Sequence, residues 1–360
     1  MKIAMIAPPI ENVPPRFYGG TERVVSVLTE ELVKRGHDVT LFASGNSKTS
    51  AKLVSVFDKP LREAYPTMEE IGKRIQMTLM HLGNAYSFQD AFDVIHDHTG
   101  YFGLPFAQSA RVPVVSTIHG PLTKEVIPLY ERFSKPHLVS ISYSQRKNAL
   151  YLNHAANIYN GLSMTHYPHS LPQKGYLLAV GRFSPEKGIH NAITIAQKLG
   201  LPLIIAAKLE EKNVDYFNEK IKPHLNKKIV WVGEVSETQR NRLMAEALCF
   251  LHPLEWEEPF GLTIIEAMAC GTPVVAFNKG SMNEIILHGK TGFLAKNIDQ
   301  AVGYIKNISQ IDREYCRLYS LSNFSSGKMA NEYESVYESL LTSLDSYTLT
   351  NRAKSIILKA

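Results

Sequence analysis

Two carboxylates, Glu258 and Glu266, stand eight positions apart in the stretch from Glu255 to Ala276. Glu258 precedes a Pro-Phe-Gly turn, and Glu266 lies in the apolar, helix-like run that follows the turn. A carboxylate can accept two hydrogen bonds from neighbouring hydroxyls, which is what a ribose or hexose diol offers. Pro259 and Gly261 mark the start of the helix, whose first backbone N–H groups lack intrahelical acceptors and attract an anion. The stretch therefore predicts a site for sugar hydroxyls beside a site for phosphate.

The same two acids also have a structural interpretation. Glu258 could do no more than favour the helix dipole, and Glu266 could be a buried acid paired with a cation. An acid in a run as apolar as residues 262–270 is costly without a partner, which favours a functional role for Glu266.

Two cations follow a predicted strand in the segment VGRFSPEKG. Arg182 ends the strand, and Lys187 comes five residues later, after a Ser-Pro turn. Two cations on one short loop can hold a dianionic or diphosphate group. Two surface cations on either side of a turn would have the same sequence. The segment alone therefore does not distinguish a phosphate site from an exposed turn.

Two glycines, Gly19 and Gly20, lie between the first predicted strand and the first predicted helix. Glycines at such a place let backbone amides approach a ligand, and the start of a helix favours an anion. The pair is not the G-x-G-x-x-G fingerprint, so it does not predict a dinucleotide site. A bare pair of glycines is also common in turns.

The sequence HDHTG places His96, Asp97 and His98 at the end of another predicted strand. Alternate residues of a strand point to opposite faces, so Asp97 would not share a face with the two histidines. Polar residues that line a cleft, or plain packing, therefore explain the three residues better than a metal site does. The three cysteines include no C-x-x-C pair, which predicts neither a disulfide frame nor a zinc site and fits a reducing cytoplasm.

Short apolar runs alternate with amphipathic segments along both halves of the chain, which predicts parallel sheets with helices on both faces. The predicted strands lie at residues 2–8, 37–44, 92–98, 112–120 and 136–144, then at 176–183, 201–208, 227–235, 250–253 and 272–277. The main predicted helices lie at residues 21–36, about 66–88, 190–200, 238–250, from 262 onward, and 327–347.

The strand–helix pattern starts again after residues 163–174, so the chain is expected to form two domains. Residues 1–165 would form an N-terminal domain, residues 166–328 a C-terminal domain, and residues 329–360 a helix and tail that pack back on the first domain. Ligands of such sheets bind at the carboxyl ends of the strands, and a cleft between the two domains is the natural site.

Composition narrows the classes of protein that the chain could represent. A chain of 360 residues is too long for a single hydrophobic core, so more than one domain is expected. Its net charge of +5 is smaller than that of a typical nucleic-acid-binding domain. No apolar run is long enough to cross a membrane, and the N-terminus resembles a first strand more than a signal peptide. We expect a cytoplasmic protein, and its mild positive charge leaves room for peripheral contact with an anionic membrane surface.

The motifs, in their order, resemble those of the retaining GT-B glycosyltransferases of family 4, which include sucrose synthases and bacterial mannosyl- and glucosyltransferases. EPFGLTIIE resembles the family's E-x7-E motif, GRFSPEKG its phosphate loop, YGGTE its glycine-rich loop and STIHG its strand-end histidine. CGTPVVA and GKTGFL are also typical of it. The resemblance covers residues 1 to about 340 and implies the GT-B fold, in which two Rossmann-like, doubly wound domains face each other across a cleft.

The resemblance also implies a role for each residue. Arg182 and Lys187 would bind the donor diphosphate and stabilise it as it leaves. Glu266 would hold ribose hydroxyls, Glu258 would contact hydroxyls of the transferred sugar, and His119 would contact the donor sugar near the reacting carbon. The donor site would be completed by backbone around the glycines and the helix start: Gly19, Gly20, Pro259, Phe260, Gly261, Leu262, Thr263.

The implied reaction moves a hexosyl group from a nucleotide sugar to a hydroxyl of a sugar-containing or lipid-linked acceptor. UDP is the commoner donor nucleotide of such families and GDP is the alternative. Retention would follow from a front-face step in which the departing phosphate takes the acceptor proton. The family works without a tightly bound metal, and the chain has no D-x-D motif. Glu258 is the one residue kept open as a covalent nucleophile.

Other functions remain open at this stage. A phosphorylase would need a pyridoxal lysine and a far longer chain, and an epimerase on the same fold would need its own catalytic acids. A non-catalytic sugar-nucleotide-binding scaffold subunit is disfavoured because all the charged residues of the motifs are present. The acceptor and the oligomeric state are not encoded in any motif, and segment 60–90 matches no motif of the family.

Overall fold

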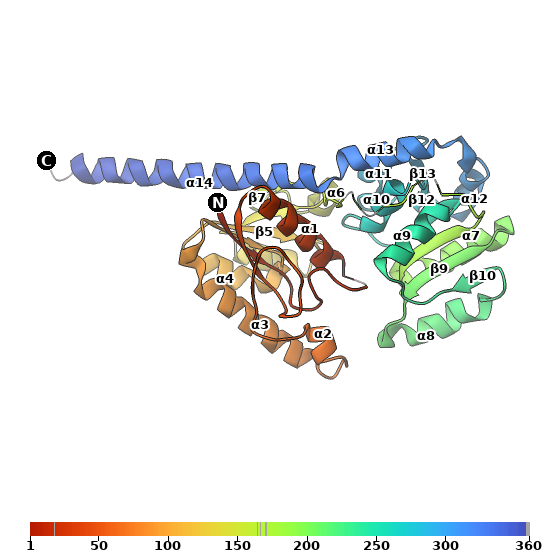
Figure 1. Ribbon diagram of the computed structural model, residues 1–360, viewed down its shortest axis with the longest axis horizontal. Helices are drawn as coiled ribbons and strands as arrows, with labels where there is room; N and C mark the ends of the chain where they lie inside the picture. Colours follow the sequence, from red (N-terminus) through yellow and green to blue (C-terminus); the bar gives the residue numbers. More distant parts are fainter. Residues whose placement is uncertain (18, 164, 166, 170, 358–360) are drawn as a thin grey trace.

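The computed structural model describes residues 1–17, 19–163, 165, 167–169 and 171–357, with side chains through residue 343. Figure 1 shows two α/β domains side by side, with the C-terminal helix running back along the first of them. The chain passes from the first domain to the second between the strands that end at Asn157 and begin at Leu177.

The first domain is built on a parallel sheet of seven strands in the order β3-β2-β1-β4-β5-β6-β7. The inner strand β1 pairs with both β2 and β4, so the strand order reverses beside it, which is where doubly wound sheets bind ligands. The strands of this sheet are β1 (Lys2–Ile6), β2 (Asp38–Phe42), β3 (Lys52–Val54), β4 (Val94–Asp97), β5 (Val114–Ile118), β6 (His137–Ser140) and β7 (His154–Asn157).

The second domain repeats the plan with a parallel sheet of six strands in the order β10-β9-β8-β11-β12-β13. Here the order reverses between β8 and β11, and both strands lead into loops that face the first domain. Its strands are β8 (Leu177–Arg182), β9 (Leu203–Lys208), β10 (Ile229–Trp231), β11 (Cys249–His252), β12 (Val274–Phe277) and β13 (Gly292–Ala295). The expectation of two doubly wound parallel sheets is confirmed.

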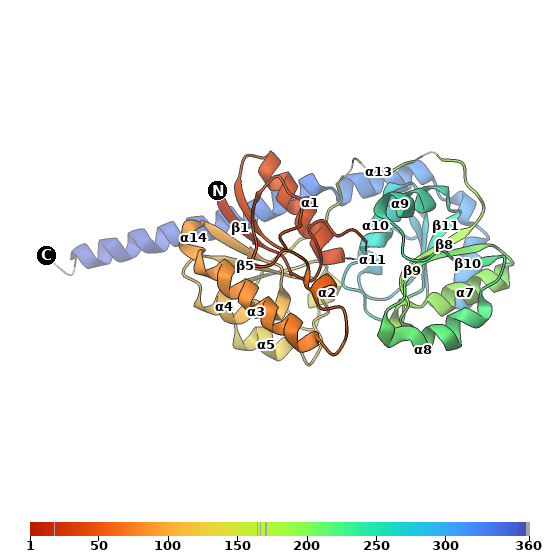
Figure 2. The same ribbon diagram turned by 60° about the horizontal axis from the view of Figure 1, so that its bottom comes forward.

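Helices cover both faces of each sheet (Figures 1 and 2). In the first domain α1 packs against α14 on one face, while α3 and α4 pack together on the other. In the second domain α7 and α12 share one face, and α9, α10 and α13 the other. The helices of the first domain are α1 (Gly20–Lys34), α2 (Leu61–Ala64), α3 (Ile71–Ser87), α4 (Leu104–Ser109), α5 (Ile127–Arg132) and α6 (Tyr143–Arg146). The remaining helices are α7 (Ile189–Leu199), α8 (Val214–Tyr216), α9 (Glu237–Glu246), α10 (Leu262–Ala269), α11 (Met282–Ile285), α12 (Ile298–Ile305), α13 (Arg313–Asn323) and α14 (Ser326–Ile357).

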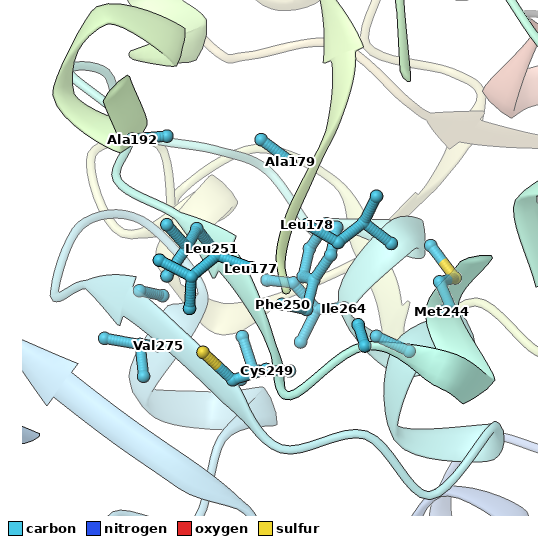
Figure 3. Packing of buried hydrophobic residues seen from close by; sticks show 14 of the residues in the cluster. Leu177, Leu178, Ala179, Ala192, Met244, Cys249, Phe250, Leu251, Ile264 and Val275 are labelled. Carbon is cyan, nitrogen blue, oxygen red and sulfur yellow. The ribbon is translucent and has the colours of Figure 1, made fainter. Parts of the chain in front are cut away.

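The core of the second domain fixes the strands that carry its loops. Figure 3 shows side chains of three neighbouring strands packed together, with α9 and α10 closing one side through Met244 and Ile264. Leu177 and Phe250 in this cluster are fully buried. Burying an aliphatic or aromatic side chain of this size contributes about 2 kcal/mol, so the ends of β8 and β11 are held on a rigid base.

The C-terminal helix α14 begins where the chain returns to the first domain. Leu162 and Ser325 form a parallel bridge, and α14 starts at the next residue. Tyr333 and Tyr337 of α14 are buried against the first domain's sheet, in the same cluster as Leu28 of α1. The two domains are therefore connected twice, once by the linker and once by the start of α14.

Candidate active site

The cleft between the domains lies at the carboxyl ends of both sheets and encloses about 350 Å³, the size of a small-molecule site. Every residue that the sequence placed in the donor site lines this cleft. From the first domain these are Gly19, Gly20 and His119. From the second domain they are Arg182, Lys187, Glu258, Pro259, Phe260, Gly261, Leu262, Thr263 and Glu266. The structure thus brings the set together, while the role of each member stays a prediction.

Lys187 and Glu258 form an ion pair at the centre of the site. Lys187 Nζ lies 2.6 Å from Glu258 Oε2, and both side chains are largely buried. Trp256 donates its indole N–H to the same carboxylate oxygen at 2.9 Å, and its ring lies 5.0 Å from the ammonium. The sequence did not predict that these two residues, 71 positions apart, would bind each other.

A glycine allows this approach. Gly188 follows Lys187 with a positive φ of 65°, and a Cβ there would lie 1.9 Å from the carbonyl oxygen of Pro253. The phosphate loop therefore rests directly on the loop that follows β11. This contact places Lys187 over the segment that carries Glu258.

Arg182, at the end of β8, forms ion pairs with two acids, Glu186 and Glu210. Its guanidinium lies 2.8 Å from Glu186 and 3.5 Å from Glu210. Within the described part of the chain its buried Nε has no hydrogen-bond partner. The guanidinium therefore keeps hydrogen-bonding capacity in the cleft that an anionic ligand could use.

Glu266 is a buried acid with a partner. Its carboxylate accepts a hydrogen bond from Arg240 at 2.7 Å, and the residue is 1% exposed. Burial raises the pKa of Glu266, while Arg240 and Arg23 oppose that rise. Glu266 is therefore a buried acid paired with a cation, as the structural interpretation of the sequence has it. Because Glu266 also lines the cleft, its carboxylate could contact a ligand as well.

Two helix starts face each other across the cleft. Gly261 precedes α10 with a positive φ of 96°, and Gly19 precedes α1. Among the residues that the structure describes, no side chain caps the start of either helix. A Cβ on Gly20 would lie 3.4 Å from Leu262 Cδ1, so the two termini nearly touch. Uncapped helix N-termini that converge in this way are suited to bind an anion between them.

His119 follows β5 and reaches the cleft from the first domain. Its Nε2 lies 2.9 Å from Nδ1 of His98, and burial lowers the pKa of His119 to about 4, so the ring is neutral. Asp97 points to the opposite face, where Tyr86 donates its hydroxyl at 2.7 Å. Among the described residues no three His, Cys, Asp or Glu side chains are arranged so that they could hold a metal ion. The alternation expected for His96, Asp97 and His98 is what the structure has.

Several charged residues of the cleft were not predicted. Glu22 and Glu11 lie on the side of the first domain, with Arg62 beside them, and Arg23 pairs with Glu237 of the second domain. Burial raises the pKa of Glu22 to about 7, with Glu11 adding to the rise. The signal for Glu22 was its place in YGGTE, two positions after the glycine pair.

Comparisons with known proteins agree with this geometry. A glycogen synthase of Mycobacterium tuberculosis is 27% identical over 345 residues, which cover 81% of this chain and 81% of that protein. A sucrose-phosphate synthase structure from Thermosynechococcus elongatus matches with a TM-score of 0.77 at 18% identity, over 95% of this chain and 100% of that one. The Anabaena protein HepE, solved in complex with UDP, matches with a TM-score of 0.70 at 19% identity, over 94% and 100% of the two chains.

Two family models divide the chain where the domains divide. The model for Glycosyltransferase Family 4 matches residues 18–161, and the model for Glycosyl transferases group 1 matches residues 168–318. Together they cover most of the chain, and the structural neighbours are GT-B glycosyltransferases. The chain accordingly belongs to the GT-B glycosyltransferases of family 4, as its motifs indicated.

Proposed function

We propose that the protein transfers a hexosyl group from a UDP-sugar to a hydroxyl of a sugar-containing or lipid-linked acceptor, with retention at the anomeric carbon. A GDP-sugar is the alternative donor. Positive charge at the diphosphate would come from Arg182, Lys187 and the start of α10, without a tightly bound metal or other cofactor. Products of this class are polysaccharides, glycolipids and small glycosides.

The observation that carries the proposal is the Lys187–Glu258 pair beside the uncapped start of α10. A nucleotide sugar offers each partner a ligand group: a phosphate oxygen for the ammonium and a sugar hydroxyl for the carboxylate. When the diphosphate binds Lys187, Glu258 loses its ion pair but still accepts the indole N–H of Trp256. The remaining lone pairs of the Glu258 carboxylate can then accept a sugar hydroxyl. One molecule would then satisfy both residues.

The reaction follows from where charge develops. As the bond between the anomeric carbon and phosphate breaks, negative charge accumulates on the diphosphate, and fixed cations and amides stabilise it. The acceptor hydroxyl would attack from the same face, and a phosphate oxygen would take its proton. Glu258 would bind hydroxyls of the transferred sugar.

The donor nucleotide is proposed from the neighbours. HepE of Anabaena was solved in complex with UDP and, in another structure, with UDP-glucose. In this chain Glu266 would hold the ribose, and Arg240 fixes the orientation of its carboxylate.

The proposal places the protein in the cytoplasm. Its three cysteines are free and buried, as they would be in a reducing compartment. No helix in the described ranges combines the length and apolarity that crossing a bilayer would require. A lipid-linked acceptor would then be reached by peripheral contact with the membrane.

A thermal-shift screen tests the proposal. The purified protein would be heated with UDP, GDP, ADP and their common sugar conjugates, beside the variants Arg182→Ala and Arg111→Ala. Arg111 is exposed, forms an ion pair with Asp90 and is not among the described residues that line the cleft, so it controls for loss of an arginine. We expect one nucleotide to raise the melting temperature of the wild type and of Arg111→Ala, but not of Arg182→Ala. A shift that survives in Arg182→Ala would refute the phosphate site.

Turnover then separates an enzyme from a binding subunit. With the stabilising nucleotide sugar and a panel of hydroxyl acceptors, we expect release of the nucleoside diphosphate, undiminished by EDTA. The anomeric configuration of the product, read by proton NMR, should match that of the donor. Binding without release would favour a scaffold subunit, and an inverted product would exclude the retaining mechanism.

A further inference from the structure

A chain of contacts among three histidines, two of them buried, leads from the C-terminal helix to the cleft. His96 Nδ1 lies 2.6 Å from the hydroxyl of Tyr337 on α14, and its Nε2 lies 2.7 Å from Thr117 Oγ1 on β5. The rings of His96 and His98 pack with centroids 3.9 Å apart. His98 Nδ1 in turn lies 2.9 Å from Nε2 of His119, the member that lines the cleft.

The direction of the bond between His98 and His119 follows from the partner on the other side of His98. The sulfur of Met5 lies 3.1 Å from His98 Nε2, and a thioether has no proton to donate. The hydrogen of His98 therefore sits on Nε2. Burial, together with His96 and His119 nearby, lowers the pKa of His98 well below its usual value, so the ring carries one N–H only. Nδ1 must then accept, and His119 Nε2 must donate.

The same reasoning fixes the free nitrogen of His119. Its ring is neutral, and its hydrogen is committed to Nε2 by the bond to His98. Nδ1 is left with a lone pair and no hydrogen. In the described part of the chain His119 Nδ1 forms no hydrogen bond, and the ring borders the cleft.

We infer that His98 is a positioning residue for His119, fixing the tautomer whose Nδ1 is an acceptor for a hydroxyl of the donor sugar. The inference deepens the proposed function and rests on it for the identity of that ligand. A nitrogen with a lone pair can only accept, so the group that meets it must bring a proton, as a hydroxyl does and a carboxylate does not.

The rest of the cluster holds His98 in place. Both ring nitrogens of His96 are bonded, and Thr117 also lies 2.8 Å from the hydroxyl of Tyr333 on α14. His98 thus packs against a ring that is anchored from two elements. Its own backbone N–H donates to the carbonyl of Ile6 on β1 at 3.0 Å.

Two variants of His98 separate positioning from packing. His98→Asn places an amide oxygen near the position of Nδ1 and keeps an acceptor for His119. His98→Phe keeps a ring of similar shape and removes both nitrogens. His81→Phe is the matched control, because His81 is a buried histidine of the same domain whose Nε2 bonds the carbonyl of Ala7, outside the cluster.

The first readout is the tautomer of His119, from long-range ¹H–¹⁵N spectra of histidine-labelled protein, with the signals assigned through His119→Gln. We expect hydrogen on Nε2 in the wild type, in His98→Asn and in His81→Phe, and a mixture of tautomers in His98→Phe. Hydrogen on Nδ1 in the wild type, or an unchanged tautomer in His98→Phe, would overturn the inference. This readout needs no substrate, so a wild type that turned over no nucleotide sugar would count against the proposed function alone.

The second readout is kinetic. Loss of a partner that orients a metal-ligating histidine costs about 10- to 100-fold in activity, and by analogy kcat of His98→Phe should fall by a comparable factor. The Kd for the nucleoside diphosphate should change little, because the cations proposed to bind it, Arg182 and Lys187, lie on the second domain. His98→Asn should recover most of kcat, and His81→Phe should keep it. Equal losses in His98→Asn and His98→Phe would show that only packing matters and would overturn the inference.

Discussion

At the scale of single residues, the types and spacing of the charged residues predicted which side chains meet in the cleft, but not how they pair. The sequence offered Arg182 and Lys187 as one clamp, and the structure binds them to different acids. Arg240 was not anticipated at all, because it lies 26 positions before Glu266 and comes beside it only when α9 packs on α10. Pairing depends on tertiary packing, which motif spacing does not contain.

Glu22 gives a pH dependence whose sign can be worked out. Burial raises its pKa from 4.5 to about 7; Glu11 adds to the rise and Arg62 opposes it. Between these values the folded state binds more protons than the unfolded state, so stability falls as pH rises from about 4.5 to about 7. Glu22→Gln removes this loss. The free energy of unfolding of the variant should exceed that of the wild type by up to about 3 kcal/mol at pH 8, and this difference should vanish at pH 4.

Urea unfolding of both proteins at pH 4, 6 and 8 measures the effect. Glu69→Gln, an exposed glutamate of the same domain, serves as the control and should follow the wild type at each pH. A difference between Glu22→Gln and wild type that is the same at every pH would show that the pKa of Glu22 does not differ between the folded and unfolded states, and would refute the argument.

At the scale of elements, the sequence predicted the central strands and missed three strands at the sheet edges, β3, β7 and β13. Inner strands such as β12 are fully buried and read as continuous apolar runs. β3 and β7 contain no fully buried residue, so their letters carry no apolar run, and β13 begins with a glycine. Edge strands are specified by pairing with a neighbour more than by their own composition. The site residues were predictable because they follow the buried strands.

The contact beneath the phosphate loop yields a test at this scale. Gly188 and Gly200 flank α7 with nearly equal φ values, 65° and 67°. A Cβ on Gly200 would meet nothing within 4 Å, whereas a Cβ on Gly188 would lie 1.9 Å from the oxygen of Pro253. Both alanine variants carry the left-handed backbone strain of about 1 kcal/mol. Only Gly188→Ala should also move Lys187 away from Glu258.

Isothermal titration with the nucleoside diphosphate separates the two effects. Loss of one charge-assisted contact amounts to about 1.5–3 kcal/mol, or about tenfold or more in Kd, for Gly188→Ala. Gly200→Ala should bind as the wild type does, with a melting temperature lowered by a few degrees. Equal affinities in the two variants would mean that the close approach at Gly188 does not position the phosphate site.

At the scale of the whole molecule, contacts between the domains surround the cleft. The contacts differ in burial: Lys147 and Glu257 form an exposed pair, while Glu284 is half-buried and binds the start of α6. The cross-domain ion pairs of the described residues include Arg23–Glu237, Arg62–Glu210 and Lys147–Glu257. Since His119 and the phosphate loop belong to different domains, donor binding is expected to favour a closed arrangement.

The hydrogen bonds of Glu284 should be the contacts between the domains that most restrict their opening. Its carboxylate accepts the backbone N–H groups of Tyr143 and Ser144 at 2.8 and 2.7 Å and the hydroxyl of Tyr159 at 3.0 Å. Hydrogen bonds to a charged group contribute about 1.5–3 kcal/mol each, and Glu284→Ala removes all three. An exposed pair contributes about 0–1 kcal/mol, so Glu257→Ala is the matched control.

Small-angle scattering measures the outcome. The radius of gyration of Glu284→Ala should exceed that of the wild type and of Glu257→Ala, because the second domain loses its anchor on α6. Saturating nucleotide sugar should reduce the difference, since a ligand bound by both domains replaces the lost contact with its own. A radius for Glu284→Ala equal to that of the wild type would place the restraint elsewhere, at the paired connections formed by the linker and the start of α14.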